Sequence, residues 1–316
     1  MVISTCQHSQ TKKHGRDRNG NQRLRCMVCG KTFAEPVVRP LGDMRTSVKD
    51  AATALGLLLE GMSVRAVERL TGLKRDTICE LILVVGANCR RLLNEKVHDV
   101  AVADVQCDEL WSFVGCKERT RVARRHTGDE GSCWTFIAIE RNTKLVLAHT
   151  VGQRDNQTCW EFVGQLSAAT AGRFQLSTDG LGAYTLNVPF MFQGRVDFGQ
   201  LVKNYAGTQS VSRYSPAKII GAEKRPRSGN PDPDRICTSH IERLNLTLRM
   251  NLRRFTRLTN AHSKSMRHHK AMQAIFFAWY NFARKHDAIK QTPAQAAGLA
   301  DKQWTIRELI ELSAAV

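Results

Sequence analysis

A single acid among arginines is the most informative group of charged residues in this sequence. Glu242 lies in the segment CTSHIERLNLTLRMNLRRFTRLTN, which contains five arginines. If this segment is helical at about 100° per residue, Arg249, Arg253 and Arg257 fall on the same face as Glu242, apart from the apolar stripe. A solvated helix usually mixes its charges. We therefore expect an acid at the start of a basic track that binds a polyanion.

Two aspartates further upstream lie on predicted strands. Asp108 is part of DVQCDELWSFVG, where an ionised carboxylate is costly to bury unless a cation, such as a metal ion, compensates it. Asp179 ends the predicted strand RFQLSTDG, although an Asp-Gly pair by itself is most often a turn. Glu109 should point to the other side of its strand, as a surface or salt-bridge residue.

Cysteine and histidine residues near the N-terminus indicate a different metal site. Cys26 and Cys29 form a CxxC pair in RLRCMVCGKTF, and such a pair on a tight turn lets two thiolates bind one zinc ion. Cys6 precedes them, but a serine stands three residues later, where a second CxxC would have cysteine. Either His8 or His14 would supply the fourth ligand. The alternative is a basic arm without zinc.

The charge of the chain favours a polyanionic partner. Its 47 Lys and Arg against 29 Asp and Glu give a formal net charge of +18, and so basic a surface usually binds nucleic acid. A merely basic protein without such a partner is the alternative.

No apolar segment resembles a signal peptide or membrane span. We expect a protein of the bacterial or archaeal cytosol, associated with the nucleoid and not with membranes, whose ten cysteines form no disulfide framework.

The region after the cysteines reads as helices separated by short breaks. Ser63 can cap a helix that ends near Gly72, and the next helix begins near Arg75 after the turn TGLK. This arrangement matches a helix-turn-helix, in which the start of the second helix faces base edges in the major groove. Lys74, Arg75 and Thr77 are the expected DNA-binding residues, although similar trihelical packing occurs in proteins that bind no DNA.

Strands dominate from about residue 100. DVQCDELWSFVG is followed by CWTFIAIE and KLVLAHT, joined by a short turn, then by a helix over NQTCWEFVGQLSAATA and the strand that ends at Asp179. Three strands, a helix and a strand beside the first is the ribonuclease-H-like order. Many α/β proteins begin in the same way, so the order alone supports this fold weakly.

Three blocks of this region resemble those of a known family. QCDELWSFVG, LSTDGLGAY and SHIERLNLTLRMNLRRFTRLTN resemble the catalytic blocks of DDE transposases of the insertion-sequence-one type. Members of that family also carry a zinc ribbon and a helix-turn-helix ahead of a ribonuclease-H-like catalytic domain, so the resemblance covers nearly the whole chain. It implies that Asp108, Asp179 and Glu242 are the catalytic acids and that Arg249 is the family's downstream basic residue.

The resemblance implies an α/β fold with a definite organisation. The expected parts are a zinc-ribbon-like module (1–40), a helix-turn-helix domain (41–98), a ribonuclease-H-like DDE catalytic domain (99–290) with an insertion-like loop (about 205–236), and a C-terminal tail (291–316). The loop contains two tyrosines and several basic residues. Contact with DNA and an ordered surface loop without that role both remain open. The tail should end in a helix capped by Thr305.

Metal-dependent phosphoryl transfer follows from the three acids. Carboxylates converging at one end of a sheet would hold two Mg²⁺ or Mn²⁺ ions, which clamp the attacking and leaving oxygens of an in-line displacement. The implied reactions are cleavage at the ends of the element and strand transfer into target DNA. Arg253 and Arg257 would neutralise phosphates. Two ends must be joined, so a homo-oligomer on DNA is expected. The expected ligands of a structural zinc ion are Cys6, His8, Cys26 and Cys29.

Other functions are compatible with parts of this pattern. A repressor would bind DNA through the helix-turn-helix and catalyse nothing. A structure-specific nuclease would share the metal site and lack only strand transfer. A recombinase with a serine or tyrosine nucleophile is disfavoured, because no such residue stands in a suitable group of acids and arginines.

Overall fold

The computed structural model describes residues 6–18, 20–34, 39–126, 128–205, 219–256 and 259–316. The chain divides into two compact units, Met1–Arg39 and Pro40–Val316. The larger unit combines a six-stranded mixed sheet with helices, which confirms the predicted α/β class. Within the described ranges, no helix is both long and apolar enough to cross a membrane.

The smaller unit is a three-stranded antiparallel sheet. Its strands, in spatial order, are β1 (Thr11–Arg16), β2 (Gln22–Cys26) and β3 (Thr32–Ala34). The turn after β2 is closed by the Gly30 N–H, which donates to the Cys26 carbonyl at 3.0 Å, and Gly30 takes a φ of 72° that suits glycine. Cys26 is the one buried side chain among the described residues 6–34. The described residues of this unit therefore form no hydrophobic core.

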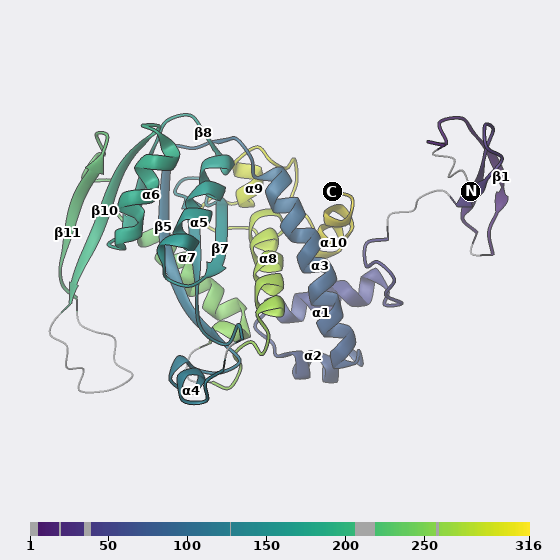
Figure 1. The fold of residues 1–316 in the computed structure, drawn as a ribbon, viewed down its shortest axis with the longest axis horizontal. Coiled ribbons are helices and arrows are strands. Elements are labelled where there is room, and N and C mark those ends of the chain that lie inside the picture. The colour runs from purple at the N-terminus through teal and green to yellow at the C-terminus, as the bar shows by residue number, and fades with distance from the viewer. Residues whose placement is uncertain (1–5, 19, 35–38, 127, 206–218, 257–258) are drawn as a thin grey trace. The chain divides into compact units, whose positions relative to one another are not determined.

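The sheet of the larger unit has the spatial order β11-β10-β9-β5-β6-β7 (Figure 1). Its strands are β5 (Asp104–Val114), β6 (Gly131–Glu140), β7 (Val146–Gly152), β9 (Phe174–Asp179), β10 (Val196–Tyr205) and β11 (Ile219–Ser228). β5, β6 and β7 are antiparallel neighbours, whereas β9 runs parallel to β5, and β10 parallel to β9. β4 (Val100–Ala101) and β8 (Thr170–Ala171) form a separate short parallel pair.

Helices cover both faces of this sheet. α5 (Asn156–Ala169) and α6 (Gly182–Phe192) cover one face, and α7 (Ser239–Asn251) and α8 (Met266–Phe282) cover the other. Phe162 of α5 packs on Phe136 of β6, whereas Gln273 of α8 bonds to the neighbouring Thr135, whose side chain points the opposite way. α8 also packs along α3 (Arg75–Lys96), so it is buried on nearly all sides.

The predicted helix boundaries before the sheet are confirmed. α1 (Val48–Leu59) precedes α2 (Val64–Thr71), and the Ser63 hydroxyl accepts from the Ala66 N–H at the start of α2. Gly72 ends α2 in the left-handed conformation, with a φ of 72°, and α3 begins at Arg75. α3 then continues for 22 residues, because its buried side chains pack against α8 and the C-terminal helix.

The arginine-rich segment is not one continuous helix, contrary to the prediction. α7 stops at Asn251, Leu252 is extended, and a short 3₁₀ turn, η1 (Arg253–Phe255), follows. The break keeps both Leu252 and Phe255 buried, and it ties the chain to α1 through the Asn251 side-chain amide, which donates to the Leu59 carbonyl at 2.8 Å. Tertiary packing therefore ends the helix at Asn251, although the apolar periodicity of the sequence continues to Phe255.

The expected loop at about 205–236 is only partly irregular. Ile219–Ser228 forms β11, which pairs antiparallel with β10 at the edge of the sheet. Edge strands are often charged and contain proline, so IIGAEKRPRS lacks the apolar alternation that would have revealed it. Residues 206–218 of the expected loop lie outside the described ranges.

The C-terminal segment belongs to the core of the larger unit and is not an appended tail. α9 (Pro293–Ala296) packs on α8, and α10 (Ile306–Ala314) packs on α1 and α3. Leu309 and Ile310 of α10 are fully buried. Thr305 caps α10, as predicted, and the structure shows that it forms a capping box with Glu308.

Candidate active site and metal centre

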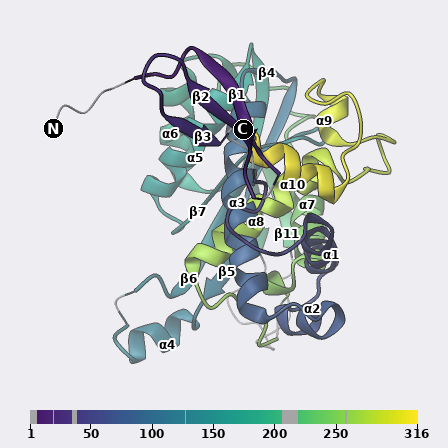
Figure 2. The ribbon, with the colours of Figure 1, turned by 90° about the vertical axis from the view of Figure 1, so that its right-hand side faces the viewer.

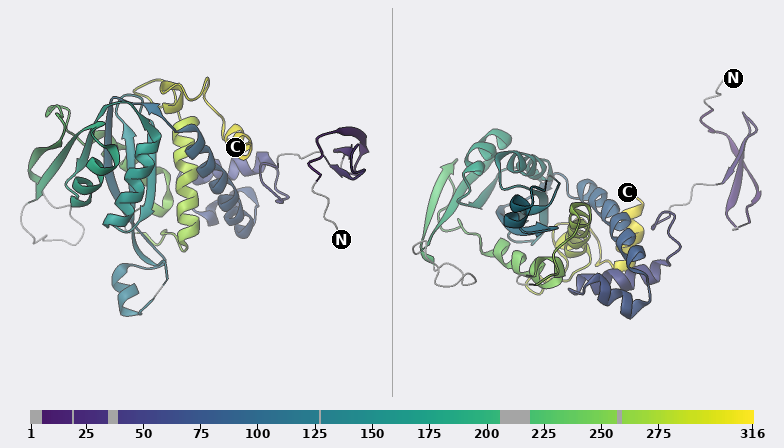
Figure 3. Two further views of the ribbon diagram at one scale, coloured as in Figure 1. Left: turned by 45° about the horizontal axis from the view of Figure 1, so that its top comes forward. Right: turned by 60° about the horizontal axis from the view of Figure 1, so that its bottom comes forward.

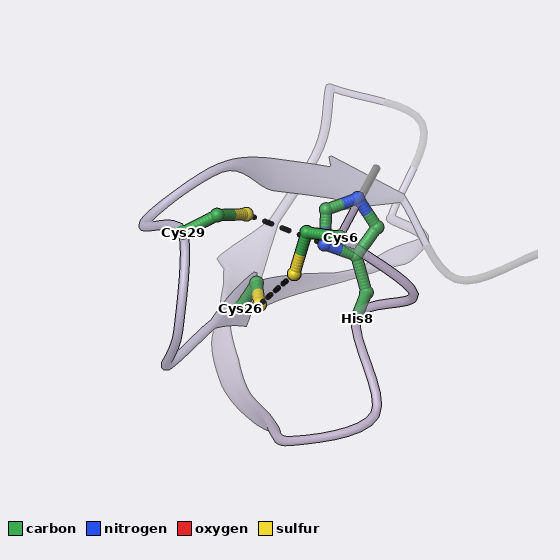
Figure 4. A group of neighbouring side chains, drawn as sticks. All are labelled: Cys6, His8, Cys26 and Cys29. Atoms are coloured by element: carbon green, nitrogen blue, oxygen red, sulfur yellow. Dashed lines mark hydrogen bonds between the residues drawn. The ribbon is translucent and has the colours of Figure 1, made fainter. Parts of the chain in front are cut away.

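Four potential metal ligands meet in the smaller unit. The Cys6 and Cys26 sulfurs are 3.7 Å apart, and the Cys29 sulfur lies 3.4 Å from Nδ1 of His8 (Figure 4). All four ligand atoms lie within 4.8 Å of one another. A tetrahedron with zinc–sulfur bonds of about 2.3 Å has sulfur–sulfur edges of about 3.8 Å, so these residues fit a tetrahedral ion. His14, the alternative ligand, lies in β1 with an exposed side chain.

The thiol of Cys26 is prepared for ionisation. A backbone hydrogen bond from Cys29, and then the side chain of His8, lower its pKa to about 6. Thiolate is the form that binds a metal ion. The structure brings together the four expected ligands, with His8 ahead of β1 and His14 within it.

The second group of ligands lies where two parallel strands adjoin. β5 and β9 pair with Cys107 opposite Thr178, which brings Asp108 and Asp179 side by side one residue further along. One carboxylate oxygen each of Asp108, Glu109 and Asp179 lies within 4.8 Å of the other two. These three oxygen donors form a group of the kind that hard divalent cations bind.

Asp108 and Glu109 are held from opposite faces of the sheet. The side-chain amide of Asn245 in α7 donates to Asp108 at 2.8 Å. On the other face the Tyr184 hydroxyl donates to Glu109 at 2.6 Å. Arg154 bridges Glu109 and Asp179, donating to them at 3.1 and 3.0 Å.

Glu109 differs from the expectation in one respect. It makes the predicted salt bridge, but it is buried and does not lie on the surface. Helix α6 packs on this face of the sheet and places Tyr184 over Glu109. The pattern of residues in the strand does not predict that helix. Sequence reasoning therefore missed Glu109 as a member of the acidic group, and it also missed Arg154, for which no motif gave a signal.

Glu242 lies at the edge of this group. It occupies the first turn of α7 and forms an ion pair with Lys203 of β10. The Thr238 hydroxyl donates to its carboxylate at 2.6 Å. The negative charge of Glu242, like that of Asp179, raises the pKa of Asp108. The tight group of three carboxylates nevertheless does not include Glu242.

The acids of this site repel one another. Burial and then the charge of Asp179 raise the pKa of Asp108 to about 6. The same two causes raise the pKa of Glu109 to about 8. Arg154 and Lys203 thus compensate the negative charge incompletely. A divalent cation would lower both pKa values, because it favours the ionised carboxylates.

The predicted basic residues are distributed over several elements. Arg249 lies in the last turn of α7, two helical turns after Glu242, and Arg253 is exposed in η1. Arg257 lies outside the described residues. Lys74 and Arg75 are exposed at the start of α3, where the Arg75 guanidinium pairs with Glu68 at 3.2 Å. Thr77 follows them in the first turn of α3 and is half-buried.

Comparison with known protein families gives a match over the segment that forms the central part of the sheet. The family model described as IS1 transposase matches residues 101–193, the segment that contains Asp108, Glu109 and Asp179. This segment of the chain is therefore similar to IS1 transposases. The resemblance inferred from the three sequence blocks is thereby confirmed. Glu242 lies beyond the matched residues.

Individual proteins match longer parts of the chain than the family model does. The protein InsB of insertion element iso-IS1n from Shigella dysenteriae is 29% identical over 177 residues, which cover 56% of this chain and 95% of that protein. Among solved structures, the piggyBac transposase synaptic complex with hairpin DNA matches 86% of this chain and 73% of its own, at 9% identity and a TM-score of 0.42.

Proposed function

We propose that this protein is a DNA transposase that binds the ends of an insertion element, cleaves them and transfers the cut strand into target DNA. The observation that carries the proposal is the convergence of Asp108 and Asp179 on adjacent parallel strands of the IS1-type domain. Glu242 completes the catalytic acids from the first turn of α7. The three acids are the proposed ligands of two Mg²⁺ or Mn²⁺ ions.

The connectivity of the sheet supports a ribonuclease-H-like catalytic domain over residues 99–290. β7-β6-β5-β9-β10 are neighbours in that order, with the first three antiparallel and the last two parallel to β5. Ahead of it we propose a zinc ribbon over residues 1–40 and a helix-turn-helix over 41–98. The tetrahedral spacing of four ligands supports the zinc ribbon, and the α2-turn-α3 arrangement supports the helix-turn-helix.

Two divalent ions would supply Lewis-acid polarisation of the phosphoryl group and a strong oxygen nucleophile for in-line displacement. The chain's own residues prepare that site. Asn245 orients the Asp108 carboxylate, and Arg154 holds Asp179 beside Glu109. Lys203 pairs with Glu242. Ligation by Glu242 would therefore compete with this ion pair, and the ammonium group of Lys203 would become available to a phosphate oxygen.

Residues at the start of α3 and arginines after Glu242 are the proposed contacts to DNA. Lys74, Arg75 and Thr77 would contact the ends of the element from the start of α3, while Arg249, Arg253 and Arg257 would neutralise phosphates near the cut. Transposition brings two ends of the element together in one assembly. We therefore propose that the active species is a homo-oligomer on DNA, which light scattering of the complex with DNA ends would test.

The proposal is tested by strand transfer with labelled DNA ends, a target plasmid and Mg²⁺ or Mn²⁺. Wild-type protein should form metal-dependent joined product, and Glu242→Gln should lose it, since glutamine keeps the size and removes the charge. Asp301→Asn, an exposed acid in the C-terminal segment, is the matched control and should retain activity. Cleavage without joining would support the nuclease, and specific binding without either reaction would support the repressor.

The contribution of α3 to DNA binding is measured by salt dependence. The slope of log K against log salt should fall by about 1 for each phosphate that a variant no longer neutralises, so replacing Lys74 and Arg75 by alanine should reduce it by about 2 if both bind phosphates. Arg307→Ala, an exposed arginine on α10, should leave the slope unchanged. An unchanged slope in the Lys74/Arg75 variant would remove both residues from the proposed interface with phosphates.

A further inference from the structure

A third group of metal-binding side chains lies in the connection between β5 and β6. One ligand atom each of Cys116, His126 and Glu130 lies within 4.8 Å of the other two. The Cys116 thiol donates to Oε2 of Glu130 at 3.7 Å, and Nδ1 of His126 contacts the same oxygen. These residues lie beyond the C-terminal end of β5 and are distinct from the acidic group on β5 and β9.

Glycines at both ends of the connection let the acids approach the backbone. Gly115 has a φ of +70°, and a Cβ added there would lie 2.8 Å from Cγ of Glu130. Gly131 has a φ of +106°, and an added Cβ would lie 2.3 Å from Oε2 of Glu118. Any side chain at these positions would be strained and would displace the carboxylates. The backbone is therefore adapted to hold Glu130 beside Cys116.

The connection has almost no apolar packing of its own. Its helix, α4 (Glu118–Ala123), contains no buried residue, and Val122 is exposed. α4 stands away from the sheet in several views (Figures 1, 2 and 3). The Ser132 N–H of β6 donates to Glu118 at 2.9 Å, which fastens the start of α4 to the sheet. Small segments without a core commonly depend on a metal ion or a disulfide for order.

We propose that Cys116, His126 and Glu130 bind one zinc ion that fastens the α4 connection to the ends of β5 and β6. A thiolate, an imidazole and a carboxylate are all zinc ligands, and the thiolate disfavours Mg²⁺. Binding releases the thiol proton, and the two anionic ligands balance the charge of the ion. Three protein ligands leave a fourth position for water.

The surroundings of the site permit that fourth ligand. A cavity of about 690 Å³ is lined by His126 and Glu130 together with three basic residues, Arg125, Lys264 and Arg267. Solvent therefore reaches two of the ligands, so no fourth side chain is required. This inference does not depend on the proposed transposase activity, because metal content is measured without DNA.

The first test is the zinc content of the full chain after dialysis in buffer with excess Mg²⁺, which occupies the acidic site. Wild type should retain about two equivalents, one in the N-terminal unit and one at Cys116. Cys116→Ser and Cys29→Ser should each lose one equivalent, while Cys79→Ser, a half-buried thiol outside every ligand group, should lose none. Equal zinc content in wild type and Cys116→Ser would overturn the proposal.

A second test reads the site directly. Zinc should slow the alkylation of Cys116 by iodoacetamide, followed by mass spectrometry of its peptide, because a ligated thiolate is a poorer nucleophile. The rate at Cys79 should not change. His126→Ala should restore rapid alkylation of Cys116 in the presence of zinc. Zinc-independent alkylation of Cys116 in wild type would show that the three side chains form only a hydrogen-bonded group.

Discussion

Replacing Asp108 by asparagine is expected to abolish strand transfer while stabilising the fold. Asparagine keeps the size of the side chain and an acceptor for Asn245, but it removes the negative charge proposed to bind a divalent ion. We expect the rate of joining to fall by about 10³-fold or more, equivalent to roughly 4 kcal/mol of transition-state stabilisation. The assay with labelled ends and Mg²⁺ measures this loss.

The stabilisation follows from the raised pKa of Asp108, which is about 6 against an ordinary value of 3.8. The unfolded chain then loses its proton more readily than the folded chain, so the folded state is disfavoured as pH rises from about 4 through 6. Asp108→Asn removes that cost. In magnesium-free buffer the variant should be more stable than wild type by roughly 3 kcal/mol at pH 8 and should show little difference below pH 4.

Thermal unfolding at several pH values checks this prediction, and Asp301→Asn is again the control. A variant that loses both activity and stability at pH 8 would indicate a structural role for Asp108. A variant that keeps full activity would exclude Asp108 from the proposed metal site. The combination of lost activity and gained stability is typical of a charge maintained for function.

Removal of zinc from the N-terminal unit is expected to unfold that unit and abolish specific binding to the ends of the element. Cys26 is the one buried side chain among its described residues, so little apolar burial supports its three strands. Units below about 40 residues usually need metal ions or disulfides, and structural zinc contributes about 10 to 16 kcal/mol in zinc-finger peptides. Hydrogen exchange of the full chain should show rapid exchange over residues 11–34 after chelation, and unchanged protection over β5.

Matched histidine variants separate this effect from a general loss of stability. His8→Ala should reproduce the effect of chelation, whereas His14→Ala should retain zinc, because His14 lies outside the group of four ligands. Chelated protein that still discriminates element ends from unrelated DNA would contradict the role of this unit in recognition. Equal effects of the two histidine variants would contradict the ligand set.

The acidic site illustrates the limit of inference from sequence. Asp108 and Asp179 lie 71 residues apart in the chain, and only the parallel pairing of β5 with β9 makes them neighbours. Their approach was inferred through family resemblance, since neither strand specifies its partner locally. Arg154 lies outside any recognisable motif, and its contacts with Glu109 and Asp179 depend on the packing of the whole sheet.

Local features were determined by the sequence itself. The CxxC turn, the cap at Ser63, the helix end at Gly72 and the cap at Thr305 each depend on a few consecutive residues, so composition and spacing predicted them. The tertiary structure decided the end of α7 at Asn251, the edge strand β11 and the burial of Glu109. Each of these features depends on contacts between segments that are distant in the sequence. The conformational preferences of neighbouring residues do not include the free energies of such contacts.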